Sequence, residues 1–430
     1  MFQTIRNALA IPETRKKLLY TLMIIVVFRV GSAIPVPFLD PSALKAMIQS
    51  SGDFLGYLDI MTGGAFASAT IFAMSITPYI NASIIIQLLT VAIPPLERLS
   101  KEGETGRKKI AKITRFTTFA LALLQGIGYY FLALNSGAIA KSHQGGFAGF
   151  FTAAVIVVTF VAGTAIIVWL GERINEKGIG NGISVILFAG IISGGPSLIN
   201  TLVQYWNMGN SLYYVLIPLI VVIFILIIAF IVIMTNAERR ISVQYAKRVV
   251  GRKMYGGQNS HIPIKVSMSG VMPIIFASSL VSLPGTIATF FQPEPGSFWH
   301  GFLNVFNYTS IWYAIIYFVL IIGFNYFYVA IQYNPIEIAN NLRKNNGAIP
   351  GIRPGKPTSD FVSKVLSKIT FVGAIFLAII AIFPIIFTNL TGINVAIGGT
   401  SILIVVGVAL ETVRTLESQI MMRHHKGFLE

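Results

Sequence analysis

Long apolar runs separated by short polar segments recur along the whole chain. A run such as Leu212 to Met234 is long enough, at about 1.5 Å per helical residue, to cross about 30 Å of hydrocarbon. Ten such runs predict an all-α integral membrane protein with ten transmembrane helices. Their centres lie near Val27, Ile84, Leu123, Val158, Ile191, Phe224, Phe276, Leu320, Leu377 and Leu403.

The basic residues are concentrated in every second gap between these runs. Of the 32 Lys and Arg, 29 lie in the N-terminal segment, the C-terminal segment and the alternate gaps, and only Lys45, Lys141 and Arg29 lie elsewhere. Basic loops stay on the cytoplasmic side during membrane insertion. The pattern therefore predicts that both termini face the cytoplasm.

Composition agrees with a membrane protein and limits its partners. Hydrophobic residues make up 54% of the 430, charged residues 11%, and the net charge is +16 at pH 7. Because the positive excess is confined to one predicted face, it favours anionic lipids or an acidic cytoplasmic partner over nucleic acid. The absence of Cys excludes disulfides and Cys-ligated metals. The basic N-terminal segment before the first span mimics a signal peptide, but nine further spans favour an uncleaved helix.

Ten spans divide into two halves of five, predicted at residues 1–205 and 206–430. An odd number of spans per half makes the second half enter from the opposite side of the membrane. Ile76–Ser83 and Val271–Ser278 occupy equivalent places and agree at four of eight positions, a weak echo. Inverted halves usually hold the working site between them at the bilayer midplane. We therefore expect a central site on spans two, five and seven.

The segment from Phe54 to Ala73 is apolar, rich in Gly and too short to cross a membrane. Irregular backbone at membrane depth is tolerated only where protein buries it or where it faces water. The segment therefore predicts a re-entrant element seated in an external cavity. An external helix packed on the surface is the alternative.

Two predicted cytoplasmic loops, at about 236–265 and 334–364, are far longer than a connection between helices needs. In the second loop, Pro354 disfavours a helical conformation at Arg353 and holds this side chain at a stiff tip. The loops are therefore candidate docking surfaces. The alternative is a pair of solvated loops that serve only to set the topology.

The sequence contains no recognisable catalytic apparatus. It has no Gly-rich phosphate loop, and no nucleophile with a partner base falls in one region. We expect no enzyme activity, no cofactor and no metal site, and the adjacent His424 and His425 are weak metal candidates. Ion-coupled transporters normally carry ionisable groups in their spans. Here only Arg29 and Glu411 qualify.

Aliphatic side chains line the expected centre instead. Ile80 and Ile84 share one face of span two, and Ile183 and Leu187 share one face of span five. A pore narrowed by such residues would exclude water and block ions by dewetting. Ordinary packing between helices is the alternative for each residue taken singly.

Several segments then match a known family. The chain resembles the SecY family, the central channel subunits of the bacterial Sec protein translocase, along its whole length and in order. The matching segments are Asp59–Phe66, Thr77–Gln87, Gly178–Ser184, Tyr245–Arg248, His261–Ser279, Pro350–Gly355 and Gly398–Ser401.

The resemblance implies two five-helix halves around an hourglass pore, with a plug helix at about 54–69. By matching position, the pore ring would be Ile80, Ile84, Ile183, Leu187, Ile275 and Ile404. Leu187 departs from the expected isoleucine, a swap that conserves volume. The plug residues would be Phe54, Leu58, Ile60, Met61, Gly63, Gly64 and Phe66.

The resemblance also implies a lateral gate and docking loops. The gate opens between spans two and three on one side and spans seven and eight on the other, and its polar residues would be Asn81, Gln87, Thr90 and Ser278. The docking residues would be Arg239, Arg240, Lys247, Arg248, Arg252, Lys253 and Arg353. The implied partners are the small subunits SecE and SecG, the motor ATPase SecA, the ribosome, signal sequences and nascent chains.

The expected function is a channel in the bacterial plasma membrane. It would translocate unfolded secretory polypeptides and release transmembrane segments sideways into lipid. A secondary transporter of a small solute with inverted repeats is the main alternative, and it predicts a polar or charged site at the midplane. A scaffold that only gathers cytoplasmic partners would leave the re-entrant segment without a purpose.

Overall fold

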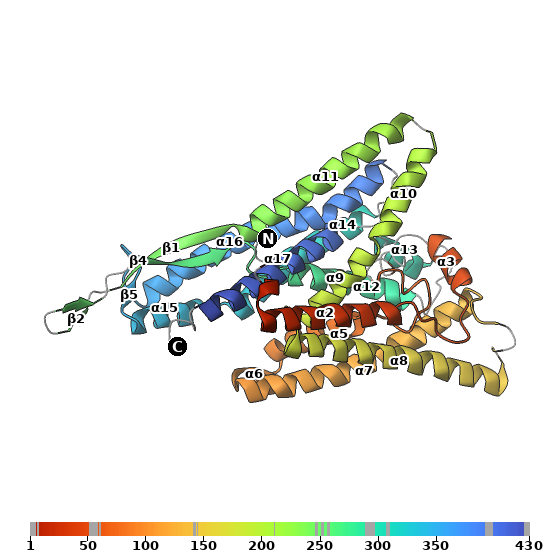
Figure 1. The fold of residues 1–430 in the computed structure, drawn as a ribbon, viewed down its shortest axis with the longest axis horizontal. Helices are drawn as coiled ribbons and strands as arrows, with labels where there is room; N and C mark the ends of the chain where they lie inside the picture. The colour runs from red at the N-terminus through yellow and green to blue at the C-terminus, as the bar shows by residue number, and fades with distance from the viewer. Residues whose placement is uncertain are drawn as a thin grey trace.

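The computed structural model describes residues 6, 8–50, 59, 62–140, 143, 145–209, 211–245, 248–250, 253–255, 259–288, 297–306, 310–391 and 399–424. Long helices pack side by side over most of the molecule (Figure 1). The helices are α2 (Pro12–Gly31), α3 (Pro41–Ser50), α5 (Thr77–Ala92), α6 (Pro94–Lys101), α7 (Glu104–Asn135), α8 (Gly146–Lys177), α9 (Gly182–Ser193), α10 (Gly195–Asn207), α11 (Ser211–Asn236), α12 (Met272–Ala288), α13 (Phe298–Val305), α14 (Ile311–Gln332), α15 (Pro335–Lys344), α16 (Lys356–Thr391) and α17 (Gly399–His424).

Each of the ten predicted span centres lies within a helix, which confirms the all-α membrane class. The ten helices are α2, α5, α7, α8, α9, α11, α12, α14, α16 and α17. In the described part of the chain, six helical stretches are long and apolar enough to cross a membrane by themselves, and the bent pair α5 and α6 would be a seventh. The other three fall short because α2 and α17 carry charges and α12 has only 17 residues.

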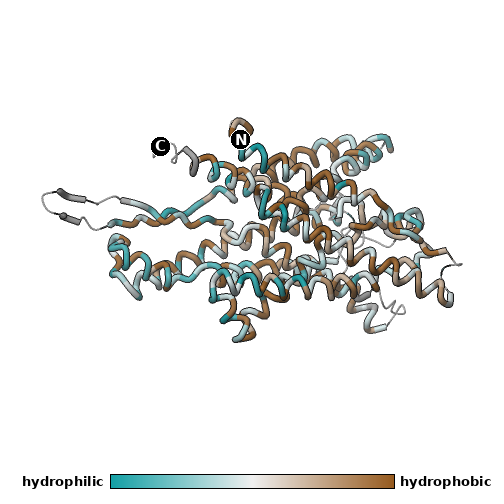
Figure 2. The backbone as a smooth tube through the Cα atoms, turned by 60° about the horizontal axis from the view of Figure 1, so that its bottom comes forward, coloured by the Kyte–Doolittle hydropathy of each residue, from teal (hydrophilic) through white to brown (hydrophobic). Residues whose placement is uncertain are grey.

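The elements in the basic gaps between spans lie at one end of the molecule, and the elements in the other gaps lie at the opposite end (Figure 1). The basic segments α6, α15 and the β strands gather at one end, and α3 and α13 lie at the other (Figure 1). Hydrophilic residues are frequent at the end that carries the strands, whereas the helices are mostly hydrophobic along the middle (Figure 2). This arrangement is the one that the alternating charge requires. That the basic end faces the cytoplasm stays a prediction.

The junction of α8 and α9 is a tight turn that the sequence encodes with Gly and Asn. Asn181 caps α9, because its side chain accepts hydrogen bonds from the backbone N–H of Ile183 and Ser184. A Cβ on Gly182 would lie 1.9 Å from the carbonyl oxygen of Gly171 on α8. Only a residue without a side chain lets the two helices approach so closely.

The first long loop contains a β ribbon that the sequence analysis did not specify. Strand β1 (Glu238–Tyr245) pairs antiparallel with β4 (Asn259–Lys265), and the short strands β2 (Arg248–Val250) and β3 (Lys253–Tyr255) pair with each other. The second loop joins the same sheet, because β5 (Gly347–Ala348) pairs with the far edge of β1. The two loops therefore form one structural unit.

The buried residues form separate clusters in the two predicted halves. One cluster joins α7 and α8 to the segment 36–74, and another joins α11, α12, α14, α16 and α17. A third cluster draws on both halves and lies between them. A smaller one packs the ribbon, and Ile349 just after β5, against α14, α15 and α16.

Candidate functional site

The cluster shared by both halves contains most of the predicted pore ring. Leu187 on α9, Ile275 on α12 and Ile404 on α17 are buried in it, and Ile80 and Ile183 pack against it half-buried. We call the whole shared cluster, together with the partly buried residues that pack against it, the central cluster. Ile84, one turn beyond Ile80, is also buried but lies outside the cluster. Five of the six predicted ring residues therefore meet in one apolar region.

A cavity of about 380 Å³ adjoins the central cluster at the end that carries the ribbon. Val271 and Met272 belong to both, since they line the cavity and pack against the cluster. Polar side chains such as Asn181, Ser184 and Gln332 line much of the remaining wall. The cavity is therefore a partly polar vestibule that ends on an apolar surface.

Three charged side chains line this vestibule: Lys265, Glu411 and Arg414. Arg414 is held in place, because its guanidinium donates to the carbonyl oxygen of Thr235 at 3.0 Å and to Oδ1 of Asn236 at 2.7 Å. Partial burial, and then the nearby Arg414, lower the pKa of Lys265. With two basic groups and one acidic group, the described wall of the vestibule carries a small positive excess.

On the opposite side of the central cluster, the described part of the predicted plug is tied to the helices around it. The Tyr129 hydroxyl on α7 donates to the carbonyl oxygen of Phe66 at 2.7 Å, and the Arg29 guanidinium donates to that of Gly63 at 3.3 Å. Gly63 adopts a positive φ of 67°, and a Cβ there would lie 2.1 Å from Oγ of Ser193 on α9.

Residues 63–76 form successive turns with a single β bridge, and regular helix resumes at Thr77. Gly64 and Phe66 lie in these turns. The other predicted plug residues, namely Phe54, Leu58, Ile60 and Met61, lie outside the described residues.

The predicted gate residues lie on α5 and α12, which contact each other. Asn81 is buried, with 8% of its surface exposed. Gln87 donates to Ser83 at 3.1 Å, Thr90 to the carbonyl oxygen of Gln87 at 2.6 Å, and Ser278 to that of Ile275 at 2.9 Å. These three bonds stay within their own helices, so none of them joins α5 to α12.

The described docking residues point to solvent. Arg239 and Arg240 on β1 are exposed, and Arg240 pairs with Glu238 at 2.7 Å. Arg353 is exposed in a turn whose backbone is fixed by the Thr358 hydroxyl, which donates to the Arg353 carbonyl oxygen at 2.8 Å.

The backbone of Arg248 and Lys253 lies in β2 and β3, at the tip of the ribbon. Lys247 and Arg252 lie outside the described residues. No strands were predicted in this loop. The alternation of Ile241, Val243 and Tyr245 with polar residues is the signal that could have predicted β1.

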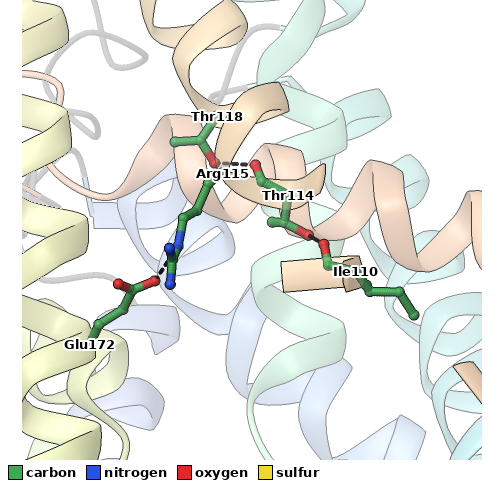
Figure 3. A network of polar contacts seen from close by, with 5 residues as sticks. All are labelled: Ile110, Thr114, Arg115, Thr118 and Glu172. Atoms are coloured by element: carbon green, nitrogen blue, oxygen red, sulfur yellow. Dashed lines mark hydrogen bonds and ion pairs between the residues drawn. The ribbon is translucent and has the colours of Figure 1, made fainter. Parts of the chain in front are cut away.

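An ion pair between α7 and α8 was also missed. Arg115 and Glu172 point toward each other, with 2.7 Å between Nε and Oε1, next to Thr118 and Thr114, whose hydroxyls bond within α7 (Figure 3). Both charged side chains are partly exposed, so the pair contributes roughly 0–1 kcal/mol to stability. Opposite charges at the ends of neighbouring spans were the available signal.

Comparisons with known proteins give a consistent picture. A model of the SecY family matches residues 70–413. The chain is 43% identical over 439 residues to the protein translocase subunit SecY of Bacillus licheniformis, and the match covers 100% of both chains.

Among solved structures, one of a protein conducting channel gives a TM-score of 0.64 at 18% identity and covers 94% of this chain and 92% of that chain. Canine Sec61 in a ribosome-channel complex gives a TM-score of 0.60 at 17% identity, with the same coverage. At identities this low, the two matches show a common fold and no more.

Proposed function

This chain belongs to the SecY family of protein-translocation channels, and from this premise we propose that the ring residues of its central cluster, together with Ile84, form the constriction of the channel. An unfolded polypeptide would enter the vestibule from the cytoplasm and pass between Ile80, Ile84, Ile183, Leu187, Ile275 and Ile404. The observation that carries the proposal is the position of the vestibule, which ends on an apolar cluster contributed by both halves. The alternative of a solute transporter has no support from the relatives.

The aliphatic side chains of the constriction suit a passage for any sequence. They offer no hydrogen-bond partner that would hold a passing chain, and their surface favours loss of water from a narrow pore. Buried Leu and Ile side chains also adapt their rotamers more readily than a fixed polar network does. Ion leak therefore stays low while polypeptides of varied composition pass.

The segment at about 54–69 would close the outer side as a plug. Its described part supports this role, because Phe66 and Gly63 accept hydrogen bonds from Tyr129 and Arg29 on two different helices. In this proposal an advancing polypeptide displaces the segment by breaking these contacts, without unfolding the bundle. The two halves, 1–205 and 206–430, would then move apart as bodies.

A lateral gate would open between α5 and α12. An apolar signal sequence shifts the population toward an open seam only if it contacts the open state better than the closed one. The gate residues Asn81, Gln87, Thr90 and Ser278 would set how easily the seam opens. The described bonds of Gln87, Thr90 and Ser278 stay within their own helices and do not cross it.

The energy for transport would come from partners, since the chain supplies no catalytic group of its own in this scheme. The exposed Arg239, Arg240 and Arg353 suit docking of the acidic surfaces of a ribosome or of SecA. SecE and SecG would complete the complex in the bacterial plasma membrane, with both termini of this chain in the cytoplasm. The structure of canine Sec61 in a ribosome-channel complex supports the ribosome as a partner.

Site-specific crosslinking tests the path of the polypeptide. A photoreactive residue at Ile275 is expected to crosslink to a secretory chain arrested during translocation, because this side chain lies in the constriction. The matched control is Ile156, which is also buried but lies in the cluster of the first half. Equal crosslinking at both positions, or none at Ile275, would contradict the proposed path.

Reversal of charge at Arg353 tests the docking surface. Arg353→Glu is expected to lower motor-driven secretion by about tenfold, the effect of losing one charge-assisted contact and adding a repulsion. Secretion into membrane vesicles with added ATP measures this. Lys356→Glu, an exposed charge three residues away, is the control. Normal ATP-dependent secretion by the Arg353 variant would remove the docking role.

A further inference from the structure

The segment 266–271, which we call the linker, connects the ribbon to α12. At its start the backbone N–H of Val266 donates to the carbonyl oxygen of Ala237 at 2.9 Å, which closes the base of the ribbon. Met268 is buried in the cluster that holds the ribbon against α14 and α16. The linker is therefore the direct mechanical connection between a docking surface and the helix that carries Ile275.

One buried amide ties this linker to two other helices. The Ser269 hydroxyl in the linker donates to Oδ1 of Asn325 on α14, and Nδ2 of Asn325 donates to the carbonyl oxygen of Thr370 on α16 at 2.9 Å. Asn325 is 2% exposed, in the middle of a helix that is otherwise strongly apolar. Asn has low helix propensity and is costly to bury, so its position is explained by the contacts it makes.

A second contact fixes the linker to the same face of α16. A Cβ on Gly373 would lie 2.5 Å from the carbonyl oxygen of Val266, so the linker backbone lies directly on this glycine. Thr370 and Gly373 are three residues apart and therefore neighbours on one helix face. The linker therefore lies against α16 at Val266, and at Ser269 it is bonded to Asn325 on α14, which in turn bonds to α16.

The attachment stops at Gly270. This residue has a positive φ of 60°, and a Cβ there would meet nothing within 4 Å. Gly270, Val271 and Met272 line the vestibule, so there is open volume next to the start of α12. The chain is therefore held before Gly270, and Gly270 itself has conformational freedom and open volume on the vestibule side. Beyond it, α12 packs on α14 through buried side chains such as Ile274 and Phe276, so a pivot at Gly270 would slide this packed face.

We propose that Asn325 is a positioning residue that anchors a hinge at Gly270, about which α12 pivots while the ribbon stays fixed to α14 and α16. The anchor makes the ribbon, α14 and α16 one body, and it limits how far the start of α12 moves. This inference rests on the proposed function, because α12 matters to transport as one side of the lateral gate. Asn325 would act on the passing chain only through α12.

Distance measurements between spin labels test the hinge. The chain has no native Cys, so pairs of introduced Cys carry the only labels on it. Leu280 on α12 and Ile85 on α5 are partly exposed and report the seam, whereas the exposed Ser260 on β4 and Asn340 on α15 report the ribbon. Pulsed electron resonance on the full chain, in the complex in which it purifies, gives both distance distributions.

Asn325→Leu is expected to increase the population with a displaced α12 about threefold to tenfold, the shift that loss of a buried interhelical hydrogen bond produces. The distance from Ser260 to Asn340 is expected to stay unchanged, since the ribbon keeps its apolar cluster and its contact with Gly373. Ser269→Ala is expected to act in the same direction, and the double variant to add little to Asn325→Leu. Ser269→Thr keeps the hydroxyl and is expected to behave as the native chain.

Thr118→Val is the matched control, because Thr118 is fully buried and donates its hydroxyl only within α7. An equal increase of the displaced α12 population in Thr118→Val would overturn the hinge. So would the absence of any increase in both Asn325→Leu and Ser269→Ala. Should Asn325→Leu fail to fold, the smaller Ser269→Ala change still decides the matter.

A secretory chain arrested in the channel separates this inference from the proposed function. If the arrested chain changes the distance from Leu280 to Ile85 while the Asn325 and Ser269 variants do not, the hinge is wrong and the gate stands. If the distance is the same in every variant and with the arrested chain bound, the gate between α5 and α12 is wrong as well.

Discussion

Replacement of Gly182 by Ala is expected to lower the free energy of unfolding by roughly 3 kcal/mol, because overpacking at a rigid contact forces backbone to move. The added Cβ would lie 1.9 Å from the carbonyl oxygen of Gly171 and 2.7 Å from its carbon. Both are backbone atoms, so no side chain can rotate away. Separation of α8 from α9 would also strain the bond from the Gly182 N–H to Oδ1 of Asn175, now 2.7 Å long.

Thermal unfolding in detergent, followed by the fluorescence of the four Trp, measures this effect. Gly195→Ala is the control, since a Cβ at this position at the start of α10 would meet nothing within 4 Å. We expect the Gly195→Ala variant to unfold at the same temperature as the native chain. Equal stability of the Gly182 and Gly195 variants would show that α8 and α9 are not packed as described.

Replacement of Leu187 and Ile404 by Ser is expected to raise the ion conductance of the channel about tenfold or more, because polar walls let water occupy a narrow pore. The two side chains are 5% and 2% exposed in the central cluster and come from different halves. The largest effect is expected with a short arrested polypeptide, which keeps the plug segment displaced. Liposomes that hold a membrane potential, or single channels in planar bilayers, report the leak.

The control for this experiment conserves volume. Leu187→Met keeps an apolar side chain of similar size and is expected to leave the conductance at the native level. A double Ser variant that folds, transports protein and still holds the potential would show that the seal lies elsewhere than in the central cluster.

Much of the fold could be predicted from the sequence because two simple signals act along the whole chain. Hydrophobic runs of membrane length fix the helices, and each predicted centre from Val27 to Leu403 lies in one. The periodicity of 3.6 residues placed Ile80 beside Ile84 and Ile183 near Leu187. That four helices bring such residues together could be expected only from the resemblance, since periodicity says nothing about contacts between distant segments.

The remaining features depend on tertiary contacts that leave a faint mark in the sequence. The ribbon was not predicted because its strands lie in a basic loop whose charge is already explained by the topology of the membrane protein. In the sequence Asn325 is a polar residue within an apolar run, and only its partners on the linker and on α16 indicate its role. The clearance around Gly182 is likewise a property of two helices and not of one.

The pairing of β5 with β1 has a consequence for exchange between relatives. Tyr245 lies opposite Gly347, and a Cβ on Gly347 would come within 2.9 Å of the Tyr245 ring. A chimera that takes residues 236–265 from another species while keeping the native 334–364 would bring two mismatched edges together. The two segments therefore form one exchangeable unit. A chimera that takes both segments from the same relative is expected to fold, whereas a chimera that takes only one is expected to fail.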